Sequence, residues 1–531
     1  MRVTCARRFG WPDWVLFVLL GLANAGGVGA FAWYSLTRGE LSVFFWLAAV
    51  VLGVWLILWE AKWLALPLMA TPHPLSVPAG LRVAAVTTFV PSGEPLAMLE
   101  TTLEALVHMR IPHETWVLDE EGTPRVRALC ARLGARYFCR AEFPRYGSAE
   151  GAFAPRTKHG NYDVWLEEIG FDCYDIVAAF DPDHMPRPDY LERLLGYFRD
   201  PAIGYVQSAP GYYNQSASFV ARAAAEEICQ HAASVLKASY GAGYAPLVGS
   251  HNVHRVAALR QIGGFPAHDA EDVLMAALYP LHGWQGVYVP ERLALGLAPA
   301  EWGAYLRQQR RWARAHVDLK LRVLPTVFSG VPWRQQLGAY LHGLHFLTSA
   351  LIPIGLGLVA TWLAVGRAPV PLSEGWPFFA APIAAIALAE LFRQRFAIES
   401  HQRGLIWRGA VVRIAKWPYV LLGILDNLRR SRPPYDLTRK AGRGPSEWLL
   451  PGVTVTAVAL IVSAWTYGAA AGGIEDPGLH ALGATVLAPL LVVLGLSRER
   501  LPHGFDAALA EQALERLRHD GKPRTPAGGS A

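Results

Sequence analysis

Charged residues are scarce in this chain of 531 residues: 17% are Asp, Glu, Lys or Arg, whereas 52% are hydrophobic. A composition this apolar excludes an ordinary soluble enzyme and predicts membrane-spanning segments. Cysteine is also rare, and the five cysteines form neither a C-x-x-C pair nor a regular spacing. The sequence therefore indicates neither a zinc site nor a disulfide framework, and reduced thiols fit a cytoplasmic domain. An internal repeat, a P-loop and a dinucleotide-binding glycine fingerprint are absent as well.

Apolar runs predict the membrane segments. The first two runs form a hairpin, and the proline-rich segment 67–78 makes a linker after it. A further segment, 405–428, carries Arg408, Arg413 and Lys416 among apolar residues, so we interpret it as an amphipathic helix lying in the membrane interface. Six runs remain as candidate crossings: 14–36, 43–66, 337–365, 378–391, 453–470 and 482–496.

The uneven distribution of arginine predicts the orientation of these crossings. The loops 366–375 and 472–478 contain one Arg and no Lys between them. The positive-inside rule then places the basic segments, and with them the large region between the second and third crossings, in the cytoplasm of a multi-pass cell (inner) membrane protein. The basic segments are 307–322, 393–413, 429–443 and 498–522.

Between the second and third crossings, short apolar strands alternate with helical segments, which is typical of a doubly wound α/β domain. The expected strands are 81–90, 115–119, 137–139, 175–180, 203–207 and 247–253. The chain is thereby divided into a hairpin with its linker (1–79), the α/β domain (80–325), a C-terminal membrane region (326–497) and a cytoplasmic tail (498–531).

The segment 175–186, D-I-V-A-A-F-D-P-D-H-M-P, is typical of a buried strand that runs into a polar loop. In a parallel sheet such a loop lies at the ligand-binding edge. Asp181, Asp183 and His184 offer the hard ligands that Mg²⁺ or Mn²⁺ needs to hold a substrate diphosphate. The alternative is a turn that caps a helix beginning near Pro188.

Three further motifs each allow a functional and a structural interpretation. Asp119 follows the second strand and is predicted either to meet a nucleotide base or ribose or to cap the helix after it. Glu271 and Asp272 open a helix, where carboxylates are also favoured by the helix dipole. The segment 308–312, Q-Q-R-R-W, lies on a basic helix that leads into the third crossing.

Together these motifs resemble those of the processive inverting glycosyltransferases of family 2, and most closely the bacterial cellulose synthases. The segment 435–440, Y-D-L-T-R-K, is similar to their gating-loop motif F-x-V-T-x-K, and 246–250, P-L-V-G-S, stands where they have F-F-C-G-S. The matches run in order from about residue 81 to 497. They are Asp119; Lys158, Gly160 and Asn161 of K-x-G-N; Asp181, Asp183 and His184 of D-x-D-H; Glu271 and Asp272 of Thr-Glu-Asp; and Gln308, Arg311 and Trp312 of Q-x-x-R-W.

The resemblance implies a GT-A-like domain inserted between membrane helices, with a role for each matched residue. Asp272, with Glu271 beside it, would supply the catalytic base, and a gating loop at 432–443 would close over the donor. The implied metal ligands for Mg²⁺ or Mn²⁺ are Asp181, Asp183 and His184. The implied donor-binding residues are Asp119, Lys158, Asp181, Gln308, Arg311, Thr438 and Lys440, and the implied acceptor residues are Trp312, Gly249 and Ser250.

The implied function is polymerisation of a β-linked polysaccharide, cellulose or another β-glucan, from a UDP-sugar such as UDP-glucose, with export through the enzyme's own membrane channel. Its partners would be the UDP-sugar, the growing polysaccharide, membrane lipid and an accessory subunit on the periplasmic or extracellular side, and no nucleic acid. Alternatives are a non-processive transferase acting on a lipid carrier, or a chitin, poly-N-acetylglucosamine or mannan-type synthase. From a different class, a transporter or channel with a nucleotide-sensing domain also remains open.

Overall fold

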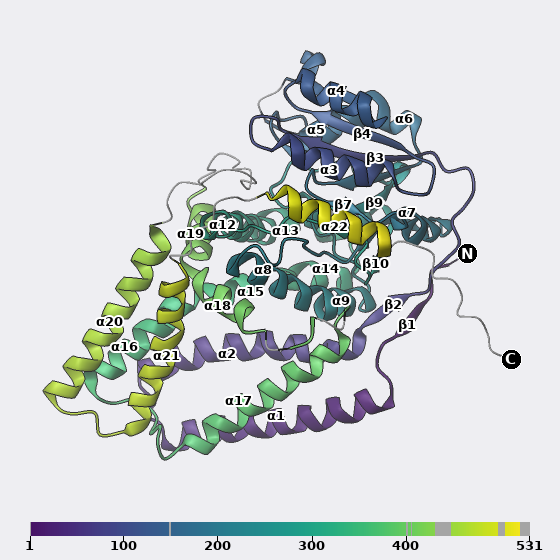
Figure 1. Cartoon of the computed structure of the whole chain (residues 1–531). Helices are drawn as coiled ribbons and strands as arrows, with labels where there is room; N and C mark the ends of the chain where they lie inside the picture. Colours follow the sequence, from purple (N-terminus) through teal and green to yellow (C-terminus); the bar gives the residue numbers. More distant parts are fainter. Residues whose placement is uncertain are drawn as a thin grey trace.

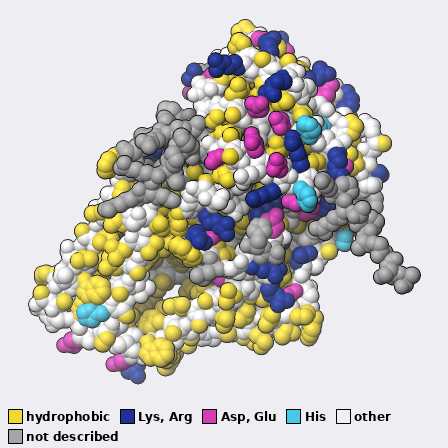
Figure 2. All heavy atoms as spheres, viewed as in Figure 1, with side chains coloured by type: hydrophobic (Ala, Val, Ile, Leu, Met, Phe, Trp, Pro, Cys, Tyr) yellow, Lys and Arg dark blue, Asp and Glu magenta, His cyan; other side chains and the backbone are white. Residues whose placement is uncertain are grey.

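A computed structural model describes residues 2–147, 150–399, 402–404, 406–430, 448–497 and 505–520. An α/β domain forms the upper part in Figure 1, and long helices from both ends of the chain form the lower part. The lower helices are covered largely by hydrophobic side chains, whereas Lys, Arg, Asp and Glu gather on the upper part (Figure 2). The predicted arrangement of an α/β domain between membrane helices is confirmed.

The domain is built on a seven-stranded mixed sheet with the order β10-β8-β9-β6-β3-β4-β5. β9 runs antiparallel to both of its neighbours, and the other pairs are parallel. The strands are β3 (Val83–Phe89), β4 (Glu114–Asp119), β5 (Arg136–Cys139), β6 (Ile176–Phe180), β8 (Ile203–Ser208), β9 (Asn252–Arg255) and β10 (Gln285–Val289).

Two of the strand predictions need correction. The segment predicted as a strand at 247–253 is mostly irregular, and β9 begins only at Asn252 and continues to Arg255. β10 (Gln285–Val289) was not predicted, because its short run Q-G-V-Y-V has an exposed, polar start. The remaining strands lie within about two residues of their predicted bounds.

Helices cover both faces of this sheet, as the apolar strands require. Alternate residues of β3 enter opposite cores: Ala84 and Val86 pack on one face, and Val83 and Ala85 on the other. The first face is covered by α5 (Lys158–Trp165), α10 (Val256–Gln261) and α11 (Glu271–Leu278), and the second by α3 (Leu96–Val107), α4 (Pro124–Leu133) and α7 (Tyr190–Leu194).

Six helical segments are long and apolar enough to cross a membrane, which confirms the predicted number among the described residues. The third of them is broken at Gly343, whose φ of +81° interrupts the helix between α14 and α15. The segments contain α1 (Trp11–Arg38), α2 (Val43–Leu64), α14 (Trp333–Leu341) with α15 (His345–Ala350) and α16 (Ile352–Val365), α17 (Trp376–Arg393), α20 (Leu449–Ala471) and α21 (Pro477–Leu496).

The segment 405–428 is not the single helix that the sequence predicts. It contains α18 (Trp407–Ala415) and α19 (Trp417–Leu428), which are separated at Lys416 because Pro418 cannot donate a backbone hydrogen bond into the preceding turn. α18 packs on α8 (Phe219–Gln230), and α19 packs along α12 (Trp302–Asp318). The pair therefore connects the membrane region to the α/β domain.

The last described segment, within the predicted tail 498–531, is a helix, α22 (Ala507–Asp520). It lies across the α/β domain against α3 and β7 (Met185–Pro186) (Figure 1). The predicted gating loop, 432–443, lies outside the described residues. Further elements are β1 (Cys5–Arg7) and β2 (Ala70–Pro72), which pair with each other, β11 (Ala294–Leu295), α6 (Phe171–Cys173), α9 (Lys237–Gly241) and α13 (Leu324–Val327).

Candidate active site

A cavity of about 1260 Å³ lies between the ligand-binding edge of the sheet and the membrane helices. It brings together most of the residues that the sequence singles out, although they are spread over some 150 positions. They are Lys158, Asp181, Asp183, His184, Gly249, Ser250, Glu271, Asp272, Gln308, Arg311 and Trp312.

The carboxylates of the D-x-D-H motif follow directly after β6. Asp181, Asp183 and His184 hold one ligand atom each within 4.8 Å of the others, so these residues fit a divalent cation. The His184 N–H donates to the Asp181 carbonyl at 3.0 Å, which confirms a tight turn. However, the residue that directly precedes α7 is Asp189. Asp181 and Asp183 therefore do not cap this helix, although the alternative interpretation of the motif requires it.

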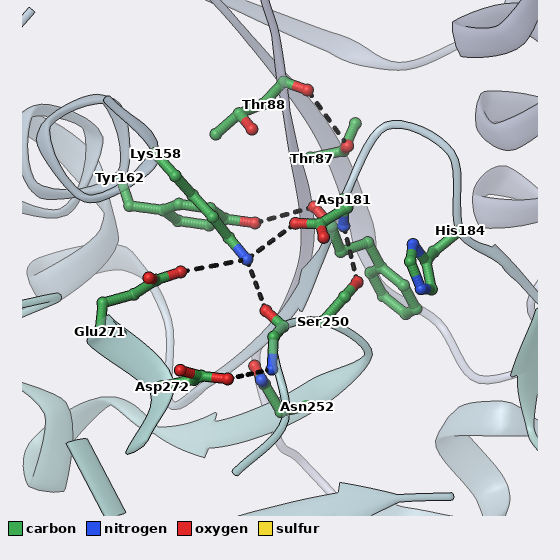
Figure 3. A network of polar contacts seen from close by, with 12 residues as sticks. Thr87, Thr88, Lys158, Tyr162, Asp181, His184, Ser250, Asn252, Glu271 and Asp272 are labelled. Carbon is green, nitrogen blue, oxygen red and sulfur yellow. Dashed lines mark hydrogen bonds and ion pairs between the residues drawn. The ribbon is translucent and has the colours of Figure 1, made fainter. Parts of the chain in front are cut away.

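Lys158, at the start of α5, connects the two acidic parts of the site (Figure 3). Its Nζ lies 2.7 Å from Asp181 Oδ1 and 3.6 Å from Glu271 Oε1, and it donates to the Gly249 carbonyl at 2.5 Å. Burial lowers the pKa of Lys158, but the carboxylates of Asp181 and Glu271 outweigh burial and raise this pKa above its ordinary value. The lysine therefore stays charged within the site.

Glu271 and Asp272 are at the N-terminus of α11. Asp272 accepts hydrogen bonds from the N–H of Gly249 at 2.5 Å and of Val273 at 2.8 Å. Burial raises the pKa of both carboxyl groups, to about 7 for Glu271. A carboxylate with a raised pKa is suited to accept a proton near neutral pH.

The Gly249 backbone faces both of these groups, with its N–H toward Asp272 and its carbonyl toward Lys158. This orientation requires a φ of +63°, which glycine adopts without a steric penalty. The neighbouring Ser250 accepts a hydrogen bond from the Asp181 N–H at 2.8 Å. The segment P-L-V-G-S therefore connects the D-x-D-H loop to the carboxylates of α11.

The Q-x-x-R-W residues lie on α12, which faces the cavity beside the membrane region. Two contacts to the α18–α19 pair hold this helix: Arg310 pairs with Asp426 at 2.7 Å, and Lys416 Nζ donates to Gln309 at 3.1 Å. Lys416 is almost fully buried and also pairs with Glu227 at 2.6 Å. A buried pair of this kind is costly to break, so it keeps α8, α12 and α18 together.

Asp119 is placed differently from the other predicted site residues. It is fully buried, and the cavity lining among the described residues does not include it. Its carboxylate accepts hydrogen bonds from the Glu121 and Thr123 N–H groups at 2.9 and 2.7 Å and from the Tyr137 hydroxyl at 3.0 Å. These bonds stabilise the turn before α4, while the adjacent Glu120 lines the cavity. Thr438 and Lys440 lie outside the described residues.

His251 is a cavity residue that the sequence analysis did not single out. It is buried, adopts a φ of +48°, and stacks on His184 with ring centroids 5.2 Å apart. Burial, with the charges of His184 and Lys158, holds the pKa of His251 well below its ordinary value, so the ring is neutral. The only indication in the sequence that His251 belongs to the site is its position directly after Ser250. Its backbone conformation depends on the fold and cannot be predicted from the sequence.

Comparison with known proteins identifies the chemistry of this site. Residues 176–391 match the profile of the family described as Glycosyl transferase family group 2. The chain contains a family 2 glycosyltransferase domain. The predicted GT-A-like fold class and the prediction of a glycosyltransferase are thereby confirmed.

Curated relatives of this glycosyltransferase include three polysaccharide synthases. Cellulose synthase 1 of Komagataeibacter xylinus is 25% identical over 427 residues, covering 70% of this chain and 26% of that protein. The UDP-forming cellulose synthase catalytic subunit of Xanthomonas axonopodis pv. citri is 27% identical over 359 residues, covering 65% of this chain and 45% of that protein. A probable glucomannan 4-beta-mannosyltransferase 7 of Oryza sativa subsp. japonica is 25% identical over 354 residues, covering 58% of each chain.

The glycosyltransferase therefore spans between about a quarter and three fifths of the length of these relatives. Among solved structures, the mannosyltransferase PcManGT of Pyrobaculum calidifontis, in complex with GDP-Man and Mn²⁺, aligns with a TM-score of 0.49 at 16% identity. That alignment covers 73% of this chain and 99% of the mannosyltransferase.

Proposed function

We propose that this glycosyltransferase is a processive, inverting enzyme that polymerises a β-linked polysaccharide, cellulose or another β-glucan, from a UDP-sugar, with UDP-glucose as the first candidate. The product is passed through the membrane helices of the same chain. The observation that carries this proposal is the shared cavity. Its lining includes the D-x-D-H residues and Asp272 together with Trp59 of α2, Ile352 of α16 and Glu390 of α17. An acceptor chain in this cavity thus has a route from the reacting groups toward the membrane.

Asp181, Asp183 and His184 would hold Mg²⁺ or Mn²⁺ in this proposal. When bound, the cation neutralises the charge that develops on the departing nucleoside diphosphate. Lys158 keeps Asp181 in place by their ion pair and adds positive charge beside the diphosphate. Arg311 offers a further cation to the diphosphate, and Gln308 offers a hydrogen bond.

Asp272 accepts the proton of the acceptor hydroxyl as that oxygen attacks the anomeric carbon. The new carbon–oxygen bond forms as the bond from the anomeric carbon to the diphosphate oxygen breaks on the opposite face. One displacement inverts the configuration, so an α-linked donor yields a β-linked product. The Trp312 ring provides a flat apolar surface on which the terminal sugar stacks. Thr438 and Lys440 would contact the donor from the gating loop.

A second product class has support among the relatives. One curated relative is named as a probable glucomannan mannosyltransferase, which makes a mannan-type product the main alternative. A non-processive transferase acting on a lipid carrier also suits a cavity that reaches membrane helices.

The decisive experiment uses the full chain, purified into lipid nanodiscs with Mn²⁺ or Mg²⁺ and radiolabelled UDP-glucose, UDP-N-acetylglucosamine or GDP-mannose. We expect label from UDP-glucose in a high-mass product that a β-glucanase degrades, and none with Asp272→Asn. Label that enters only a single-sugar, solvent-extractable lipid would refute processive synthesis. A high-mass product formed only from GDP-mannose would establish the mannan alternative.

A further inference from the structure

A second, smaller cavity of about 220 Å³ lies where α8 meets the end of α17 and the start of α18. Four arginines face it from different parts of the chain, whereas Glu226 is its one acidic lining residue among those described. The lining thus has an excess of three positive charges. The arginines are Arg222 on α8, Arg393 at the end of α17, Arg403, and Arg408 on α18.

The two carboxylates that contact these arginines, Glu226 and Glu390, do not neutralise all four of them. Glu226 already accepts from Arg408 at 3.0 Å and from the Gly409 N–H at 3.1 Å, and lies 3.9 Å from Arg222. Arg403 makes no hydrogen bond or ion pair with any residue that the structure describes. Guanidinium groups gathered around one hollow repel each other unless an anion joins them, and phosphate is one of the anions whose geometry matches the guanidinium group.

Arg393 is the most informative of the four. Its side chain is only 12% exposed, and two of its nitrogens contact Glu390 at 2.5 Å and Ser234 at 2.8 Å. Its Nε is buried without a partner among the described residues. A buried donor left unpaired costs free energy, so this atom points to a ligand that completes its hydrogen bonds.

The position of the cavity along the membrane helices indicates which kind of molecule carries that ligand. Arg393 and Gln394 belong to the candidate span Trp376–Phe396 and lie at its C-terminal end, where a membrane helix meets the lipid headgroups. Arginines at such a position are expected to contact the phosphates of anionic lipids. Arginines that only set the orientation of a membrane helix need not surround a cavity. The cavity therefore favours lipid binding over a role in orientation alone.

We propose that this arginine pocket binds the phosphate of an anionic phospholipid headgroup. The bound headgroup joins α8, the end of α17 and α18. Because Arg393 and Gln394 also line the main cavity, the lipid stabilises one of its walls. The inference does not depend on which sugar the enzyme transfers.

The test measures lipid retention by the full chain in detergent, using native mass spectrometry with phosphatidylglycerol or phosphatidylcholine. The variant is Arg222→Gln with Arg403→Gln. The matched control is Arg429→Gln with Arg430→Gln, which removes the same charge from exposed positions after α19. We expect the wild type and the control to retain phosphatidylglycerol over phosphatidylcholine, and the pocket variant to lose at least roughly tenfold in affinity.

Equal retention of phosphatidylglycerol by all three proteins would overturn the proposal. A parallel arm adds inorganic phosphate and deacylated glycerophosphoglycerol as competitors. Displacement of the lipid by inorganic phosphate at equal concentration would assign the pocket to a soluble phosphate and refute the lipid source. If the double variant is unstable, Arg403→Gln alone asks the same question, because this side chain supports no other contact among the described residues.

Discussion

At the scale of single residues, the site depends on one partly buried cation, Lys158, placed among three carboxylates. Lys158 contacts Asp181 and Glu271 directly and reaches Asp272 through the Gly249 backbone. The arrangement lets the D-x-D-H loop and the proposed base share one positive charge. The pKa values of Glu271 and Asp272 depend on burial and on the neighbouring charges, and substitutions can separate their roles.

Asp272→Asn is expected to lower the rate of transfer by roughly 10²–10⁴-fold, the usual contribution of a general base. The amide keeps the shape of the side chain but accepts no proton. Isothermal titration of UDP with Mn²⁺ should show nearly unchanged binding, which separates loss of the base from loss of the fold. Turnover close to that of the wild type would remove Asp272 from this role.

Asp183→Ala is expected to abolish the metal dependence of UDP binding. This carboxylate is buried and belongs to the group of three possible ligands. Its removal should weaken metal-dependent UDP binding by more than the roughly 10–100-fold that loss of an outer-shell partner costs. Titrations with and without Mg²⁺ measure the effect, and an unchanged difference between them would reduce the motif to a turn.

The raised pKa values of Asp272 and Glu271 predict an acid limb in the pH–rate profile. A carboxyl group whose pKa is raised takes up its proton at a higher pH, so the active Asp272 carboxylate is lost at a higher pH than that of an ordinary aspartate, and burial raises the pKa of the neighbouring Glu271 to about 7. Glu271→Gln removes a neighbouring negative charge and should move this limb to lower pH. Initial rates of UDP release from pH 5 to 9 would test it, and an unmoved limb would argue against coupling.

At the scale of elements, the site is enclosed by helices that come from distant parts of the sequence. α19 lies so close to α12 that a Cβ at Gly423 would be 2.5 Å from the Arg310 carbonyl. On the opposite side of the D-x-D-H loop, Leu514 and Leu517 of α22 belong to the same hydrophobic cluster as Met185. Met185 directly follows His184, so α22 supports the loop that carries the candidate ligands.

Leu514→Asp is therefore expected to release α22 and weaken metal-dependent UDP binding without unfolding the domain. Burial of a leucine side chain stabilises the folded state by about 1.5–3 kcal/mol, and this contribution is lost when aspartate replaces the leucine. Gln512→Asp is the matched control, since it adds the same charge on the exposed face of α22. The comparison uses the Kd for UDP with Mn²⁺ and thermal unfolding. Identical Kd values in both variants would show that α22 does not support the loop.

At the scale of the whole molecule, the six candidate spans make this a membrane protein. The position of the α/β domain relative to the bilayer follows from the arginine distribution and stays a prediction.

Labelling of intact cells with a membrane-impermeant maleimide tests this orientation. Glu475→Cys, in the loop between α20 and α21, should react from outside, whereas Arg429→Cys, after α19, should react only after permeabilisation. Cys5 and Cys173, the exposed native cysteines among the described residues, are first replaced by serine. Reaction of Arg429→Cys in intact cells would reverse the assigned orientation and place the domain outside.

The sequence by itself determined the elements that depend on local pattern. An apolar run long enough to span a bilayer has few alternatives to a membrane helix, which is why all six spans were predicted. The strand directly before Asp181 was equally clear, because five consecutive apolar residues require a covered position in a sheet. The D-x-D-H and Q-x-x-R-W motifs were recognisable because each is contiguous or confined to one helix.

Only the tertiary structure decided the features that depend on contacts between distant segments. The direction of β9, antiparallel to β6 and β8, depends on its place between these two strands and not on its own amino-acid composition. Asp119 is held away from the cavity by hydrogen bonds from the Tyr137 hydroxyl and from the turn that follows β4. The same holds for His251, which lies between Ser250 and β9 and adopts a φ of +48°. The arginine pocket draws its charges from α8, α17 and α18, and no local pattern reports that such side chains converge. A sequence shows which groups are available, but their distances result from the packing of the whole chain.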